Sequence, residues 1–150
     1  MQTLMTALMT WIAAHSGLPI PDGFPSIVYA DQASMEALSR QEPEEGALHQ
    51  SAPRLVAMYR SDLDMMVLPL DWSVDSVRDV SVLLHELVHF MQDQAIETGD
   101  LNKYPCYGAA ESPAYAAQFD WLRGAGLDPY EVLETNGLTV MAVTSCGGVP

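Results

Sequence analysis

Residues 76–99 read SVRDVSVLLHELVHFMQDQAIETG and predict one long helix. Their apolar residues recur in steps of three and four and fall within one sector of about 100°, the pattern of an amphipathic helix. Ser76 and Asp79 resemble a capping box at the start, and Gly99 supplies the stop. Further apolar residues lie on another side, so we expect this helix to be central. The apolar sector comprises Val77, Val80, Leu84, Leu87, Val88, Met91 and Ala95.

The residues that follow predict more helix. Ala109–Arg123 places small and apolar side chains on one face, and Gly124 ends the run. Asp128-Pro129 opens a short helix that we expect to end at Asn136-Gly137. The tail, Leu138–Cys146, fits either a strand or a helix.

The residues that precede the central helix mix helices and strands. Apolar side chains at helical spacing predict a helix at the N-terminus that Gly17 and Pro19 end. Ser26–Ala30 reads as a short strand, and Asp31 reads as the N-cap of a helix that reaches about Arg40. The apolar positions of the first helix are Leu4, Leu8, Trp11 and Ile12.

Two β-rich runs come next, after an acidic loop at residues 41–53. Leu55–Tyr59 and Leu63–Leu68 are separated by residues 60–62, which predicts a hairpin. Either Leu63–Leu68 or its partner strand is then expected at the edge of the sheet. Met65 and Met66 would then place one side chain on each face, or serve as core methionines.

Composition limits the class of protein. The chain has 150 residues, 49% hydrophobic residues and a formal charge of −14. We therefore expect a single domain over residues 1–150 of the α+β class, with a short sheet or hairpin packed on the central helix beside several further helices. The negative charge argues against binding to nucleic acid or an anionic membrane surface. The N-terminal helix lacks the basic start and cleavage site of a signal peptide.

The central helix carries His85-Glu86-Leu-Val-His89, an HExxH motif. Residues four apart on a helix share a face, so both imidazoles can bind one metal ion. Glu86 points aside, where it can act as general base on a water that zinc has made more acidic. The alternative is a coincidental motif on a helical domain that binds no metal.

A third protein ligand is needed, because catalytic zinc usually has three. Gln92 and Ala95 stand where metzincins carry Gly and His, and both cysteines follow the motif, which excludes the deformylase arrangement. His15 and His49 have no helical spacing to the motif. The best-placed candidate is Glu111, in the first turn of the next predicted helix.

The pair of motifs, His85-Glu86-x-x-His89 and Glu111-x-x-Ala114, resembles the gluzincin class of zinc peptidases. The chain resembles, more closely, an uncharacterised bacterial family of small HExxH metallopeptidases, a domain of unknown function. The resemblance lies in SVLLHELVHFMQ, in residues 104–118 and in the late Cys146. This resemblance covers most of the chain. It implies a minimal zincin, with a short sheet over the active-site helix. In zincins a substrate binds as an extra strand along a sheet edge beside the metal, which here would be Leu63–Leu68 or its partner. The resemblance implies no particular substrate.

The sequence departs from the gluzincin pattern in two places. Tyr115 replaces an Asp that often supports a ligand histidine, so that support must come from elsewhere, with Asp120 or Asp93 as candidates. Pro113 fits a helix only in the first turn, which predicts a helix start close to Glu111. The Tyr115 phenol is a candidate oxyanion donor in catalysis, or simply packs at a helix interface. Gln92, on the face of the ligands, lines the cleft, orients a ligand or is merely exposed.

Cys106 and Cys146 are the only cysteines, and we expect them to form a disulfide that ties the tail to the loop before Glu111. Such a bond would add about 3 to 4 kcal/mol of stability in the chain-entropy model. A disulfide favours an extracytoplasmic location, whereas free thiols would favour the cytoplasm.

The predicted function is a zinc-dependent metallopeptidase acting on a peptide or protein substrate. One Zn²⁺ would be bound by His85, His89 and Glu111, with Glu86 as the base and Tyr115 as a candidate second catalytic residue. The alternative is a zinc-binding domain with little or no peptidase activity that acts as an interaction module.

Overall fold

The computed structural model describes residues 1–40 and 56–147, and these residues form a small α+β domain. Six α-helices and a three-stranded sheet make up the described part, as the sequence predicts for the fold class. In chain order the elements are α1 (Gln2–Ser16), β1 (Ser26–Ala30), α2 (Gln32–Ser39), β2 (Met58–Arg60), the 3₁₀ turn η1 (Ser61–Leu63), β3 (Met65–Pro69), α3 (Val77–Thr98), α4 (Tyr107–Gly124), α5 (Pro129–Val132) and α6 (Gly137–Val143).

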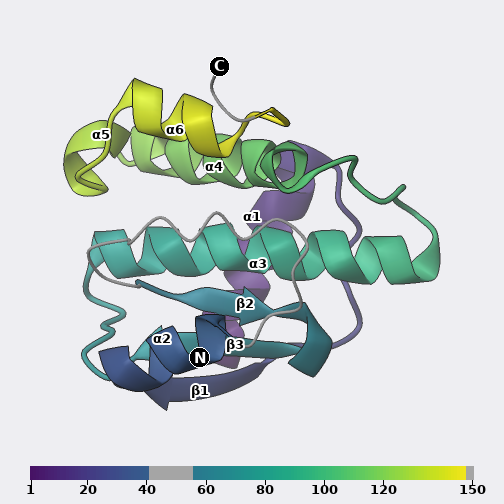
Figure 1. Cartoon of the computed structure of the whole chain (residues 1–150), viewed down its shortest axis with the longest axis horizontal. Coiled ribbons are helices and arrows are strands. Elements are labelled where there is room, and N and C mark those ends of the chain that lie inside the picture. The colour runs from purple at the N-terminus through teal and green to yellow at the C-terminus, as the bar shows by residue number, and fades with distance from the viewer. Residues whose placement is uncertain (41–55, 148–150) are drawn as a thin grey trace.

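The central position of α3 is confirmed (Figure 1), since the sheet lies on one side of this helix and α4 on the other. Ser76 caps its start by accepting a hydrogen bond from the Asp79 amide, and Gly99 ends it at a φ of 82°. Helix α3 also packs against α1, whose buried side chains are Met5, Leu8, Met9 and Ile12. The main hydrophobic core therefore surrounds α3.

The sheet confirms the predicted hairpin and settles which of its strands is central. The strand order is β1-β3-β2, with β3 parallel to β1 and antiparallel to β2. Strand β3 is therefore not an edge, and of the two predicted candidates it is its partner β2 that borders the sheet within the described residues. Met66 is completely buried between the strands and the helices. The predicted acidic loop, residues 41–53, lies outside the described residues.

Helix α4 begins at Tyr107, earlier than the sequence analysis places it. Cys106 is its N-cap, because the sulfur accepts a hydrogen bond from the Ala109 amide. Pro113 consequently lies inside the helix rather than in its first turn, so the prediction that it marks the helix start is wrong. Glu111 nevertheless remains on the buried face of α4, packed toward α3.

The C-terminal segment differs from the prediction at one boundary. Helix α5 ends at Val132, well before Asn136, which begins the next helix instead. The Asn136 side chain accepts hydrogen bonds from the amides of Leu138 and Thr139, which is the typical chemistry of an N-cap. The ambiguous tail is therefore helical over Gly137–Val143 and packs on α4.

A disulfide joins Cys106 to Cys146 and ties the end of the tail to the start of α4. Disulfides persist mainly in oxidising compartments, so this bond favours an extracytoplasmic location. Among the described residues, no helix has the length and apolar character needed to cross a membrane.

Gly108 is a position where the close approach of the tail excludes any side chain. A Cβ atom here would overlap the carbonyl of Ser145 and lie 2.8 Å from its backbone nitrogen. We expect Gly108→Ala to lower the free energy of unfolding by about 1–3 kcal/mol, measured by urea denaturation of the oxidised protein. Gly124→Ala, in the same helix with open space around it, is the control and should change stability by less than about 1 kcal/mol. Equal effects of the two substitutions would contradict the close packing of the tail.

Candidate metal centre

Three side chains that are distant in sequence converge between α3 and α4. Each of His85, His89 and Glu111 offers one ligand atom, and these atoms lie within 4.8 Å of one another. The Nε2 atom of His85 is 3.2 Å from Glu111 Oε2, and that of His89 is 3.0 Å from Glu111 Oε1. The two Nε2 atoms are 3.2 Å apart. The group could hold a metal ion, as the sequence predicts.

The local fold explains this convergence. The two histidines are four residues apart on α3 and therefore share the face that packs against α4. Glu111 enters from α4 and is only 5% exposed, while His85 is 8% exposed. Polar groups this deeply buried need partners, and here each is the partner of the others.

In the absence of a metal ion, a proton on His89 balances the negative charge of Glu111. Burial alone would lower the pKa of His89, but hydrogen bonding and charge interaction with Glu111 outweigh it and raise this pKa to about 9. Burial would likewise raise the pKa of Glu111, yet the hydrogen bonds from both histidines hold it well below its ordinary value. An imidazolium beside a carboxylate is therefore the metal-free state at neutral pH.

This charge state predicts that zinc displaces a proton. A raised pKa means that His89 is protonated below about pH 9, and a metal ligand must be neutral, so His89 should release about one proton when zinc binds at about pH 7. Zinc affinity should rise with pH and level off above about pH 9. Titration calorimetry in buffers of different ionisation enthalpy measures the released proton. Equal heats in all buffers at neutral pH would show that His89 is already neutral.

Two glutamines contact the far side of the histidine rings. Nδ1 of His85 lies 3.1 Å from Gln118 Oε1, and Nδ1 of His89 lies 3.0 Å from Gln92 Oε1. Both glutamine residues are 3% exposed. Of the roles considered for Gln92, contact with a ligand histidine is the one that the structure shows.

The carboxylates considered for this supporting role lie elsewhere. Asp120 is exposed and pairs with Arg123, and Asp93 accepts a hydrogen bond from the Tyr59 hydroxyl. Sequence analysis missed Gln118 because it looked for carboxylates. The available signal was spacing, since Gln118 follows Glu111 by about two helical turns and shares its face.

Glu86 lies beside the cluster rather than within it. Its Oε2 atom accepts a hydrogen bond of 2.9 Å from the backbone amide of Tyr59 on β2. The Glu86 charge nevertheless contributes to the raised pKa of His89, which places the carboxylate near the candidate ligands. The structure thus sets Glu86 between the candidate metal centre and the border strand β2.

Two tyrosines of α4 border the cluster. The Tyr115 ring meets the His85 ring edge-on, with centroids 4.7 Å apart, and burial together with Glu111 and Glu86 raises its pKa to about 12. Tyr107, which sequence analysis missed, is 52% exposed, and its hydroxyl interacts with Glu111. Burial of that hydroxyl and the nearby carboxylate raise its pKa above the ordinary value. Both phenols are therefore proton donors at neutral pH.

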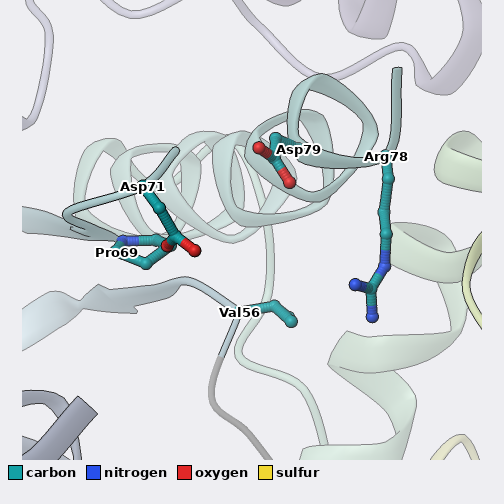
Figure 2. Close-up of a pocket in the computed structure, with 5 residues that line it drawn as sticks. All are labelled: Val56, Pro69, Asp71, Arg78 and Asp79. Atoms are coloured by element: carbon teal, nitrogen blue, oxygen red, sulfur yellow. The ribbon is translucent and has the colours of Figure 1, made fainter. Parts of the chain in front are cut away.

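Other polar groups lie apart from this centre. A small pocket of about 70 Å³ opens near the start of α3 (Figure 2), lined by Val56, Pro69, Asp71, Arg78 and Asp79. In it the Arg78 side chain extends away from the two carboxylates, toward Glu134 at 3.5 Å. His15 stacks on Trp11 and does not join the cluster, while His49 lies outside the described residues.

Comparison with known proteins identifies a family for the chain but no activity. A family model described as "Domain of unknown function (DUF6647)" matches residues 1–148. No curated protein matches the chain, and no solved structure does. The chemistry of the centre is therefore argued from its own residues.

Proposed function

The chain belongs to the DUF6647 family, and we propose that it is a zinc-dependent metallopeptidase of the gluzincin type. The observation that carries the proposal is the buried convergence of His85, His89 and Glu111, with Glu86 beside them. Two imidazoles and one carboxylate form a set of the size and chemistry used by catalytic zinc, which keeps a further position for water or substrate. One Zn²⁺ per chain is the proposed cofactor.

The ligands alone do not distinguish an enzyme from a structural zinc site, and the position of Glu86 supports the enzyme. Zinc, when bound, would polarise the peptide carbonyl and make water a better nucleophile. Glu86 would take the proton from the attacking water and pass it to the leaving amine. The hydrogen bond that it accepts from the Tyr59 amide holds the carboxylate in place for this step.

The phenols supply the remaining element of peptide hydrolysis. Attack on a carbonyl generates negative charge on its oxygen, and a donor placed near the metal stabilises that charge. Tyr115 contacts His85 and stays protonated to about pH 12, so it would serve as the donor. Tyr107, bonded to Glu111, is better suited to orienting that ligand.

The position of β2 supports a peptide as the substrate. The outward backbone of this strand faces Glu86, since the Tyr59 amide bonds that carboxylate rather than β3. An extended peptide lying beside β2 would therefore pass close to the general base. A peptide or protein substrate is accordingly proposed, whereas binding to nucleic acid or membranes is not expected from the charge of −14.

A zinc-binding interaction module would use the same three ligands, and turnover separates the two functions. The test is incubation of the zinc-loaded protein with a mixture of unstructured peptides, followed by mass spectrometry of the products. We expect new peptide termini that disappear on chelation and return when zinc is added back. Zinc bound without any cleavage would favour the interaction module, and absence of zinc binding would remove both functions.

A further inference from the structure

Gln118 has a defined orientation because of Ser81. The Ser81 hydroxyl donates its only hydrogen to the Arg78 carbonyl, at 2.7 Å. Its oxygen can then only accept from Gln118, whose Nε2 lies 3.3 Å away. The amide nitrogen of Gln118 is thus used on Ser81, and its oxygen must face Nδ1 of His85 at 3.1 Å.

Gln92 is oriented in the same way by a different group. Its Nε2 donates to the Ala110 carbonyl at 3.0 Å, and a carbonyl cannot donate in return. The Gln92 oxygen therefore faces Nδ1 of His89 at 3.0 Å. In both cases the glutamine atom that faces Nδ1 of the histidine is an acceptor, because the other hydrogen bonds of the glutamine allow its oxygen and nitrogen to be assigned in only one way.

We propose that Gln118 and Gln92 are positioning residues that hold His85 and His89 with the proton on Nδ1 and the lone pair of Nε2 toward the metal. The proposal rests on the metal site of the proposed function but not on its peptidase activity. An amide oxygen behind Nδ1 requires a hydrogen there, so in a neutral imidazole Nε2 is left free to bind. Both Nε2 atoms then point at the space that they share with Glu111.

The two positioning residues also tie the orientation of both histidine rings to α4. Gln118 is itself on α4, and Gln92 reaches the carbonyl of Ala110, the residue next to Glu111. All three ligands are therefore set by how α3 docks on α4. Because amides are neutral, this support orients the rings without adding the negative charge that a carboxylate would bring to the site.

Substitutions of Gln118 separate its role in orienting the His85 ring from its role in packing. Gln118→Met keeps the length of the side chain and removes the acceptor, so the zinc dissociation constant should rise about 10- to 100-fold. Gln118→Glu restores an acceptor and should return the affinity to within a few-fold of the wild type. Gln94→Met, at a half-buried position of α3 whose amide bonds Glu97 and no ligand histidine, is the matched control and should leave zinc affinity unchanged. Gln92→Met should repeat the loss of affinity through His89.

A second measurement reports the tautomer directly and needs no activity. In zinc-loaded, ¹⁵N-labelled protein, NMR should show both histidines bound through Nε2, each with a slowly exchanging Nδ1–H. Gln118→Met should lose the slow exchange at His85 alone, and circular dichroism of the metal-free variants checks folding. Unchanged zinc affinity and unchanged Nδ1–H exchange in both Met variants, or zinc bound through Nδ1 in the wild type, would overturn the proposal. A wild type that binds no zinc would overturn it too, whereas zinc binding without peptide cleavage would remove only the peptidase.

Discussion

Glu86→Gln is expected to lower kcat/KM for peptide cleavage by roughly 10²- to 10⁴-fold while about one zinc per chain stays bound. The loss follows from basicity, because an amide cannot accept the proton of the attacking water. The substitution is otherwise conservative, since the Gln oxygen can still accept the hydrogen bond from the Tyr59 amide. The measurement is steady-state hydrolysis of a fluorogenic peptide, together with metal analysis of the same sample.

Two further variants make the outcome at Glu86 interpretable. Glu97→Gln changes a carboxylate on the exposed end of α3 and should leave kcat/KM unaltered. Glu86→Ala leaves the Tyr59 amide without its partner, so it should also cost about 1–3 kcal/mol of stability. Activity of Glu86→Gln within about tenfold of the wild type would refute the role of general base, because such a base contributes at least about 10²-fold.

The second large effect concerns the metal itself. Glu111→Ala should reduce bound zinc from about one per chain to below about one tenth, because it removes one of three ligands and leaves two imidazoles alone. Metal analysis of the native protein by mass spectrometry, after dialysis against a weak chelator, gives the content. His85→Ala should have the same effect, and Ser112→Ala, an exposed neighbour on α4, should have none.

Stability of the metal-free variant provides a check that is independent of zinc. The lowered pKa of Glu111 means that the ionised carboxylate stabilises the fold above about pH 4.5, and that this contribution is lost as the pH falls. Glu111→Ala should therefore remove part of the acid sensitivity of the metal-free protein, measured by urea denaturation between about pH 3 and pH 7. Full zinc content in Glu111→Ala would show that another residue completes the metal site.

The part of the fold that sequence predicts best is the part governed by local chemistry. The start of α3 follows from Ser76, whose side chain accepts a hydrogen bond from a backbone amide of the first turn. Its end follows from Gly99, which adopts the left-handed conformation that stops a helix. The spacing of His85 and His89 fixes a shared face in the same way. Glu111 was found by elimination of other ligands, and its place on the buried face of α4 agrees with that choice.

Features that depend on residues beyond the neighbouring helical turn were missed or misjudged. Pro113 indicates a helix start by its own chemistry, but the capping of α4 by Cys106 moves the start earlier. The middle position of β3 depends on pairing with β1, which no local pattern encodes. Gln118 has a role only because α4 docks against His85, and its amide looks like any other in the sequence.

The contact between Gly108 and Ser145 has a consequence for how the family can evolve. The tail can lie over α4 only while position 108 has no side chain, and the disulfide keeps the tail there. A lineage that loses either cysteine no longer needs the glycine, and one that replaces the glycine must lay its tail elsewhere. Gly108, Cys106 and Cys146 should therefore be gained and lost together among relatives, while His85, His89 and Glu111 persist in both groups.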